Sequence, residues 1–437
     1  MRLLPCATLA AMLDPKSLTA RRDEIVTNCR SRGIVVDIDE TIAGSERVAE
    51  LQTALNEANR LRNEHRGRGK RKLEPAEREA HVAEGRRLKE EAGRLESELS
   101  AAREGFLERL REIPNFAHPD APVGGEEDFK ELRRWGAAPS FDFEARDHLE
   151  LGTMLDLVDF EAGARVTGQK FYFLKNEAVL LELALQRLVL ERVSERGFVL
   201  HATPDLARPE IVDGLGYSPR GEETQIYSLA NADLCLIGTS EITLGGLLAG
   251  SILEEEQLPL RLAGVSHCFR TEAGAAGRES KGLYRVHQFS KVEMFVFCRP
   301  EDSERLHEEL LTIEEEIFQA LEIPYRVIDT ATADLGAPAY RKFDLEGWMP
   351  GRGEAGDYGE LTSTSNCTDY QARRLRVRFR RKGSKKTEFV HMLNGTGVAI
   401  PRTVLAILEN HQQADGSIRI PSALQPHLGR DRIGPRA

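Results

Sequence analysis

The sequence predicts an α+β protein, with a long antiparallel pair of helices first and a domain built on antiparallel strands after it. Helical periodicity extends from about residue 45 to residue 112, with one Gly- and Pro-containing break at 65–75. Further along, strand-like runs at Leu260–Thr271 and Leu283–Phe297 flank a loop rich in Gly, Ala and charge, which is typical of a β-hairpin. We therefore expect both kinds of structure, in separate domains.

A Pro- and Gly-rich stretch that begins at Ile113, IPNFAHPDAPVGGEED, divides these two parts. The 437 residues are enough for two or three domains. We expect an N-terminal domain at 1–118, with the helical arm at about 45–112, and a second domain at 119–437. The stretch from Leu13 to about Val36 mixes helical and strand signals and should form a small base.

The composition limits the partners and the compartment. A net charge of −11 means that RNA binding would need local basic patches. The six cysteines are scattered without a CxxC pair, so neither a zinc knuckle nor a disulfide framework is indicated, and a reducing cytoplasm fits. No apolar run approaches the roughly 18 residues of a membrane span, so we expect no membrane partner. The first 11 residues are either extra residues upstream of Met12, which we favour, or a short organellar targeting segment.

The predicted arm has a narrow apolar stripe on each helix and a basic tip. The stripe of the second helix is nearly heptad, so each helix should mainly cover the other. Helices of about 35 residues would extend ~50 Å at 1.5 Å per residue. Cations at the tip favour binding of an RNA backbone, and an oligomerising coiled coil is the alternative. The tip residues are Arg66, Arg68, Lys70, Arg71 and Lys72.

The predicted hairpin carries its charges on one face. Successive strand residues point to opposite sides, so Arg270 and Glu272 share a face of the first strand. This face is either the solvated side of a half-buried sheet or the floor of a site for an anionic ligand with a flat base. On the second strand the polar face holds Arg285, His287, Phe289, Lys291 and Glu293, and the core face holds Val286, Val292, Met294 and Val296.

Other elements follow from periodicity and turn residues. Pro401 suits the first turn of a helix, so Arg402 should lie at a helix N-terminus, where backbone N–H groups already favour an anion. Gln371–Lys386 is densely basic and reads as a strand with one charged face. Helices are also expected at Glu177–Gly197 and Asp302–Leu321, and strands at Phe198–Pro204, Ile323–Asp329 and Tyr340–Pro350.

Four separated stretches carry a more specific signal. They are CFRTEAGAAGR with GLYRVHQFSKVEM between Cys268 and Met294, LIGTSEITL at 236–244, GELTSTSNCTDYQARR at 359–374 and LNGTGVAIPRTVLAILEN at 393–410. In this order they resemble the seryl-tRNA synthetases, a class II aminoacyl-tRNA synthetase family, and the first and last resemble its motifs 2 and 3. The helix and strand before Pro204 resemble motif 1, the dimer-forming motif, although an ordinary packing helix with a turn proline would look similar. Ser240 stands where the family usually has Ala, and the small side chain should preserve the loop.

The resemblance implies a site for ATP, serine and Mg²⁺. Arg270 and Arg402 would be the catalytic residues, and Glu360 and Ser363 would ligate the metal. The ATP-binding residues would be Arg270, Glu272, Arg285, Val286, Phe289, Glu360, Ser363 and Arg402. The serine-binding residues would be Thr239, Glu241, Arg270, Glu293, Asn394 and Thr396.

The resemblance also implies a catalytic domain with helices flanking an antiparallel sheet, and a homodimer. The enzyme would activate L-serine with ATP and load tRNA-Ser, and selenocysteine tRNA as well. The arm would grip the variable arm of tRNA, and Gln371–Lys386 is either a solvated strand or a track for the acceptor end. Two alternatives are a synthetase-like ligase that loads a carrier protein, which lacks the arm and uses a cysteine-bound zinc, and a non-catalytic RNA-binding paralogue, which should have lost motif arginines or carboxylates.

Overall fold

The computed structural model describes residues 15–69, 74–218, 224–273 and 281–435. The chain forms two compact units, of which the first ends at Pro114 and the second begins at Asn115. The N-terminal segment considered for targeting and the tip residues Lys70, Arg71 and Lys72 lie outside the described residues.

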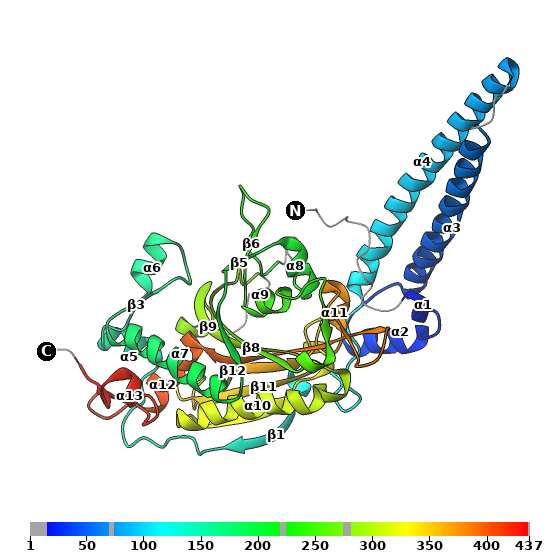
Figure 1. Ribbon diagram of the computed structural model, residues 1–437. Coiled ribbons are helices and arrows are strands. Elements are labelled where there is room, and N and C mark those ends of the chain that lie inside the picture. Colours follow the sequence, from blue (N-terminus) through cyan, green and yellow to red (C-terminus); the bar gives the residue numbers. More distant parts are fainter. Residues whose placement is uncertain (1–14, 70–73, 219–223, 274–280, 436–437) are drawn as a thin grey trace. The chain divides into compact units, whose positions relative to one another are not determined.

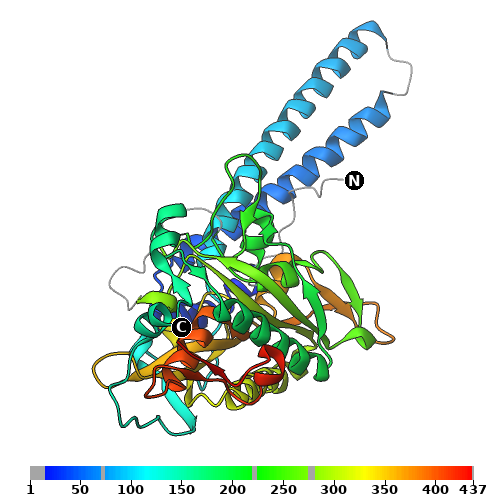
Figure 2. The same cartoon turned by 90° about the vertical axis from the view of Figure 1, so that its left-hand side faces the viewer.

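The first unit is helical. Its two long helices form an antiparallel pair that stays together along its length (Figures 1 and 2). Leu51 and Ala58 on one helix pack with Leu95 and Leu99 on the other, as the apolar stripes predict. The helices are α1 (Pro15–Leu18), α2 (Arg22–Ser31), α3 (Ile38–Arg68) and α4 (Pro75–Glu112).

The base region, whose signals were mixed, is helical where the structure describes it, and the expected start of the arm was wrong. The described part of the base region contains α1 and α2 and no strand. Helix α3 begins at Ile38 rather than near residue 45, because the Asp37 side chain accepts a hydrogen bond from the Glu40 backbone N–H (2.9 Å) and caps an earlier start. Pro75 stands in the first turn of α4, where its missing N–H costs nothing.

The second unit is organised around one eight-stranded sheet (Figure 1). All neighbouring pairs are antiparallel except β4 with β8, which are parallel, so the sheet is mixed. The expected α+β fold class is confirmed. In spatial order the strands are β1 (Lys130–Trp135), β10 (Tyr325–Asp329), β11 (Arg341–Met349), β12 (Asp357–Asn366), β15 (His391–Ala399), β9 (Gln288–Cys298), β8 (Leu260–Phe269) and β4 (Val199–Ala202).

Helices cover the sheet on both faces. On one face α10 packs on β12 and β15, while α7 and α12 contact β9, and together they bury the main hydrophobic core. Figure 1 shows α10 on the side of the sheet opposite α8 and α9. The helices are α5 (His148–Met154), α6 (Phe160–Val166), α7 (Glu177–Glu195), α8 (Pro209–Gly214), α9 (Glu241–Gly246), α10 (Ser303–Ala320), α11 (Tyr370–Leu375), α12 (Ile400–Asn410) and α13 (Gln425–Leu428).

The predicted hairpin is β8 and β9, with shorter strands than expected. The polar face holds Glu293, and the opposite face buries Val292, Met294 and Val296 in the main core, as the alternation predicts. The strands stop early because Glu272 adopts a left-handed backbone (φ 53°) and residues 282–284 form a short 3₁₀ turn. Arg285 and Glu272 therefore reach the site from loop positions.

The expectation of a strand at Gln371–Lys386 was partly wrong. Its first part is helix α11, whose Ala372 and Leu375 enter a second core with Phe379, and which ends at Arg376 in a left-handed conformation. An ion pair between Asp369 and Arg373, one turn apart, supports the helix. The short strands are β2 (Val158–Asp159), β3 (Phe173–Leu174), β5 (Leu206–Ala207), β6 (Cys235–Leu236), β7 (Ile252–Glu254), β13 (Arg378–Arg380), β14 (Thr387–Phe389), β16 (Ile418–Arg419) and β17 (Arg432–Ile433).

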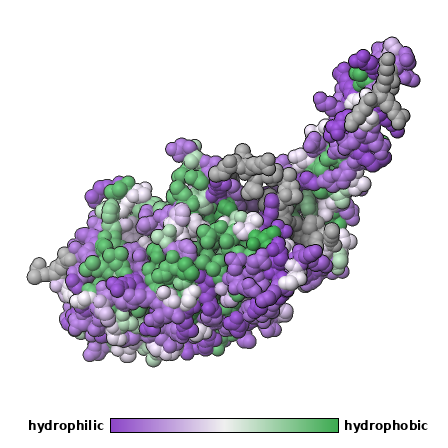
Figure 3. Space-filling model, viewed as in Figure 1, coloured by the Kyte–Doolittle hydropathy of each residue, from purple (hydrophilic) through white to green (hydrophobic). Residues whose placement is uncertain are grey.

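An apolar surface lies on the face of the second unit that carries α7 (Figure 3). Leu180 and Leu183 on α7 and Val199 and Leu200 on β4 are all exposed. Strand β4 is the last strand of the sheet, so this surface continues to a sheet edge. No helix in the described part of the chain has the length and apolarity needed to span a bilayer.

Candidate active site

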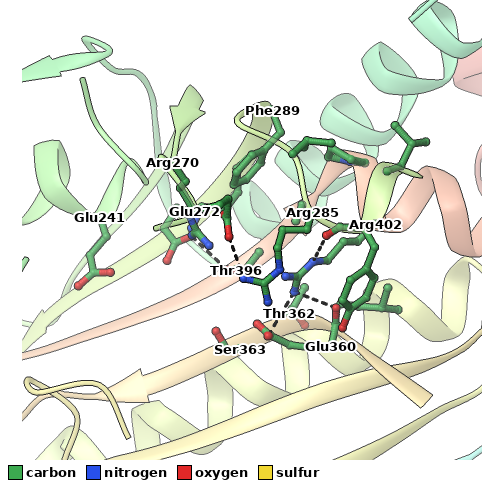
Figure 4. A pocket seen from close by; sticks show the side chains of 18 of the residues that line it. Glu241, Arg270, Glu272, Arg285, Phe289, Glu360, Thr362, Ser363, Thr396 and Arg402 are labelled. Carbon is green, nitrogen blue, oxygen red and sulfur yellow. Dashed lines mark hydrogen bonds and ion pairs between the residues drawn. The ribbon is translucent and has the colours of Figure 1, made fainter. Parts of the chain in front are cut away.

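A pocket opens above the sheet between β9, β12 and the start of α12. It brings together residues from every motif-bearing stretch, and its two ends differ in chemistry (Figure 4). Arg285, Arg402 and Glu360 converge at one end, while Glu241 lies at the other, with Arg270 between them. The lining residues include Tyr217, Glu241, Arg270, Glu272, Tyr284, Arg285, Val286, Phe289, Lys291, Glu293, Glu360, Thr362, Ser363, Asn394, Thr396 and Arg402.

Arg402 is held at the cationic end by three groups. Its Nε donates to the Tyr284 carbonyl (3.2 Å), and its Nη1 donates to the Glu360 carbonyl (3.0 Å) and lies 3.2 Å from the Glu360 carboxylate. The guanidinium also lies over the Tyr284 ring, 4.7 Å from its centre. These contacts aim a fixed cation into the pocket from the first turn of α12, as the position of Pro401 predicts.

Arg285 and Arg270 complete the cationic end. Arg285 Nη1 donates to the Glu272 carboxylate (2.8 Å), and its buried Nε has no hydrogen-bond partner among the described residues. Arg270 Nε donates to the Gly238 carbonyl (3.3 Å), and its guanidinium lies over the Phe289 ring, 5.2 Å from the centre. Three arginines around one cavity suit a polyanion.

Glu360 and Ser363 offer the oxygen donors for a metal. They are three residues apart on β12 and would face opposite sides of a regular strand. A bulge between β11 and β12, where Leu345 pairs with Thr362 and Glu346 with Glu360, turns both toward the pocket. One carboxylate and one hydroxyl fit Mg²⁺, which is commonly bound by one or two carboxylates together with substrate phosphates and water.

The Glu360 carboxylate stays ionised. Its partial burial opposes the charge, but Arg402, Lys342 and Arg270 outweigh that effect and hold its pKa well below the usual value. The side chain is 42% exposed, so the carboxylate remains accessible to a cation in the pocket.

The opposite end of the pocket contains two buried carboxylates. Glu293 forms an ion pair with Lys291, and it accepts hydrogen bonds from Thr396 Oγ1 (3.2 Å) and Asn394 Nδ2 (3.3 Å). The Glu293 and Lys291 charges are both buried, and the Glu293 carboxylate could also pair with the ammonium of a substrate.

Glu241 is the second carboxylate. It accepts hydrogen bonds from Tyr217 OH and Gln371 Nε2, both at 2.7 Å. Burial first, and then the nearby Glu293 charge, raise the pKa of Glu241 to about 7. Because the Glu241 and Glu293 carboxylates repel each other when both are ionised, binding of a cation beside them is favoured.

One buried acid lies on the other side of the sheet. Glu314 on α10 is fully buried and accepts a hydrogen bond from Thr362 Oγ1 (3.0 Å). Its other oxygen would lie 2.9 Å from a Cβ placed on Gly395, so the backbone of β15 passes very close. Burial raises the pKa of Glu314 well above its usual value.

Most predicted site residues of the second unit line the pocket, with one exception. Thr239 is not among the described residues that line it, and its buried hydroxyl instead accepts a hydrogen bond from the Glu241 N–H (3.2 Å). Residues that the sequence reasoning did not assign to the site are Tyr217, Gln371, Lys291 and Tyr284. Lys291 shares the strand face of Glu293, which was a usable signal, whereas Tyr217 and Gln371 reach Glu241 only through the tertiary fold.

The basic stretch that begins in α11 forms many internal ion pairs. Arg374 contacts Asp213, Arg380 contacts Glu254, and Arg381 contacts both Glu301 and Glu388. The pairs offset much of its charge, so the described side chains here favour the interpretation as a structural, solvated element. In the first unit, Arg66 and Arg68 are exposed in the last turn of α3.

Comparisons with known proteins agree with the motifs. Residues 12–117 match the seryl-tRNA synthetase N-terminal domain, and residues 227–411 match the tRNA synthetase class II core domain (G, H, P, S and T). The serine–tRNA ligase of Treponema denticola is 53% identical over 97% of this chain and 100% of its own length. That of Rubrobacter xylanophilus is 52% identical over 97% and 99%.

A solved structure shows the same relationship in three dimensions. Seryl-tRNA synthetase from Pyrococcus horikoshii, complexed with ATP, is 38% identical with a TM-score of 0.84, covering 97% of this chain and 100% of that one. The resemblance inferred from the motifs is therefore confirmed. With relatives of this identity along almost its entire length, the chain belongs to the seryl-tRNA synthetase (serine–tRNA ligase) family.

Proposed function

We propose that the pocket activates L-serine with ATP and that the protein then transfers the seryl group to the 3′ end of tRNA-Ser. The main supporting observation is that one pocket has a carboxylate end and an arginine end. This arrangement suits an amino acid bound next to a triphosphate. Relatives at about half identity along nearly the full chain are serine–tRNA ligases, which supports the same reaction.

In the first step a carboxylate oxygen of serine attacks the α-phosphorus of ATP. A new P–O bond forms, the bond to the bridging oxygen of the β-phosphate breaks, and pyrophosphate leaves with that electron pair. No protein nucleophile is needed, so the protein's part is to align the reactants and to balance charge that develops on phosphoryl oxygens. Arg270, between the two ends, is suited to the α-phosphate and the serine carboxylate, and Arg285 and Arg402 to the outer phosphates.

The purine and the metal have matching partners nearby. Phe289 offers a ring face for adenine, and Glu272 offers an acceptor for its amino group. Glu360 and Ser363 would hold Mg²⁺, which offsets negative charge on the phosphates when it is bound.

Serine recognition falls to the carboxylate end. Glu293 and Glu241 would bind the ammonium, and Thr396 and Asn394, both bonded to Glu293, would meet the side-chain hydroxyl. A site built to bond a hydroxyl leaves its own buried polar groups unpaired when alanine enters, which disfavours alanine. The small cavity would exclude larger side chains.

The second step needs tRNA. A hydroxyl of the terminal adenosine attacks the seryl carbonyl, the new ester forms and AMP leaves. An N-terminal domain at about 1–118, which contains the first unit, would bind the variable arm of tRNA with its helical hairpin, because Arg66 and Arg68 lie exposed at the end of α3. The catalytic domain would occupy 119–437. Selenocysteine tRNA would be a second substrate.

A homodimer is part of the same proposal. Exposed apolar residues on α7 and on the edge strand β4 form a continuous surface, and Pro204 is exposed directly after that strand. A surface of this kind is well suited to a second copy of the chain, in which the arm of one subunit would serve the site of the other. We expect the dimer to act in the cytoplasm.

ATP–pyrophosphate exchange tests the first step without tRNA. Purified protein with Mg²⁺ should exchange strongly with serine and weakly with threonine, alanine and cysteine. Arg270→Ala and Glu293→Ala should abolish the exchange. A folded dimer that shows no exchange with any of the four amino acids would overturn the catalytic assignment and favour the RNA-binding paralogue.

A further inference from the structure

A buried histidine and glutamate form a pair outside the pocket. His148, in the first turn of α5, places Nδ1 2.8 Å from Oε1 of Glu409, in the last turn of α12. Both residues are almost fully buried. Glu409 also accepts hydrogen bonds from the His148 N–H (3.0 Å) and the Gly351 N–H (2.8 Å), so both of its oxygens are engaged.

The pair defines the tautomer of His148. Because Nδ1 faces a carboxylate, it carries the proton, and Nε2 is then an acceptor. Nε2 accepts a hydrogen bond from the Leu283 backbone N–H at 3.2 Å. Glu409 thus orients His148 so that its Nε2 accepts a hydrogen bond from the Leu283 N–H in the 282–284 turn. This turn leads from the hairpin loop into β9.

The backbone of that turn is shaped to this contact. Gly282 has φ +55°, and a Cβ at that position would lie 2.2 Å from His148 Nε2 and 2.7 Å from Leu149 Cδ2. A side chain at 282 would be strained and would displace the histidine. Lys281, immediately before the turn, forms an ion pair with Asp147 beside His148, so two adjacent contacts attach the turn to α5.

The next residues of the turn belong to the pocket. The Tyr284 carbonyl accepts a hydrogen bond from Arg402, its ring lies under the same guanidinium, and Arg285 follows directly. Helix α12 therefore contacts the turn in two ways: directly through Arg402, and indirectly through Glu409, which orients His148. Both contacts hold the segment that leads into Arg285 and that also bonds Arg402.

We infer that His148, oriented by Glu409, is a positioning residue for ATP: it seats the 282–284 turn so that Arg285 and Arg402 point at the outer phosphates. This inference deepens the proposed function and rests on it. A displacement of about 1 Å at a binding group can cost on the order of a hundredfold in rate, so a single backbone hydrogen bond is enough to matter. The serine end of the pocket is built from other elements, so serine binding should not depend on the pair.

The test compares variants in serine-dependent ATP–pyrophosphate exchange and in direct calorimetric titration with Mg–ATP. His148→Leu removes the acceptor for Leu283, and Gly282→Ala disturbs the same contact from the other side. His148→Gln keeps an acceptor at the end of the side chain. The matched control is His411→Leu, since His411 is an equally buried histidine beyond the end of α12 whose Nε2 bonds the Leu321 carbonyl (2.9 Å) away from the turn.

We expect His148→Leu and Gly282→Ala to raise the KM and the Kd for ATP by about tenfold or more, with the KM for serine changed less than about twofold. His148→Gln should recover most of the ATP affinity, and His411→Leu should alter neither KM even if it lowers the melting temperature. In the triple variant His148→Leu/Arg285→Ala/Arg402→Ala, the loss should not exceed that of Arg285→Ala/Arg402→Ala by more than about twofold, because the turn acts through these two arginines.

Equal effects on the serine and ATP constants, an unrescued His148→Gln, or a further multiplicative loss when His148→Leu is added to Arg285→Ala/Arg402→Ala would overturn the inference. The calorimetric titration distinguishes failure of the positioning inference from failure of the proposed function. If the wild-type protein binds ATP but exchanges with no amino acid, the proposed function fails, while weaker ATP binding by His148→Leu still supports the positioning role. If ATP affinity is the same in His148→Leu as in the wild type, the positioning role fails, whatever the exchange assay gives.

Discussion

The raised pKa of Glu241 makes a specific prediction for serine binding. Burial and the Glu293 charge set this pKa at about 7, although Tyr217 and Gln371 both donate to the carboxylate. With a pKa near 7, the side chain is roughly nine-tenths ionised at pH 8 and one-tenth ionised at pH 6. Only the ionised form attracts the ammonium of serine, so acidification should weaken serine binding.

The size of the effect follows from the ionised fraction. When only a fraction of the protein is competent to bind, the apparent dissociation constant rises in inverse proportion to that fraction. The KM for serine should therefore rise about tenfold between pH 8 and pH 6, equivalent to about 1.4 kcal/mol. Glu241→Gln is neutral at every pH, so its KM should be high at pH 8 and nearly constant across the range.

The assay is ATP–pyrophosphate exchange at fixed ionic strength, with the serine KM measured at half-unit steps of pH. ATP and Mg²⁺ are kept saturating at each pH, because phosphate groups also titrate near pH 6. A wild-type KM for serine that changes less than twofold from pH 8 to pH 6 would refute the reasoning. So would an equal pH dependence in Glu241→Gln, since another group would then be titrating.

Three further predictions test other parts of the structure. Arg402→Lys should lower kcat/KM for ATP by about a hundredfold, because an ammonium cannot bond Tyr284, Glu360 and a phosphate from one planar group; a loss below threefold would contradict this. Glu314 has a raised pKa in the folded protein, so its stabilising contribution is complete below about pH 4.5 and is lost as the pH rises. In thermal unfolding, Glu314→Gln should therefore match or exceed the stability of the wild type at pH 8. If the variant falls further below the wild type at pH 8 than at pH 5, this prediction is wrong. Arg66→Ala/Arg68→Ala should weaken tRNA binding and reduce the slope of log affinity against log salt by about 1.8. The control Arg86→Ala removes an arginine that is paired with Glu90 on the same arm, and it should leave the slope unchanged. If the wild type and Arg66→Ala/Arg68→Ala have the same slope, the tip does not contact the RNA backbone.

Local patterns predicted most of the fold because they act within a few residues. The arm helices, α7 and α10 follow apolar periodicity, and α4 begins at Pro75, although the Asp37 cap starts α3 earlier than expected. The strand expected at Gln371 failed because alternating arginines and apolar residues suit a strand as well as a short helix, and burial of Leu375 in the second core decided between them. The parallel pairing of β4 could not be read from its own four residues, because pairing depends on a partner about 60 positions away.

The sequence by itself determined most of the charged groups that the site contains, since its motifs resemble those of a family. The tertiary structure alone decided how these groups face one another. Glu360 and Ser363 share the pocket only because a bulge interrupts strand alternation. Burial and the charge of Glu293, which lies far away in sequence, raise the pKa of Glu241 to about 7. Periodicity specifies a side chain's direction only within one regular element, whereas strand bulges, burial and electrostatic environment arise when distant segments pack together.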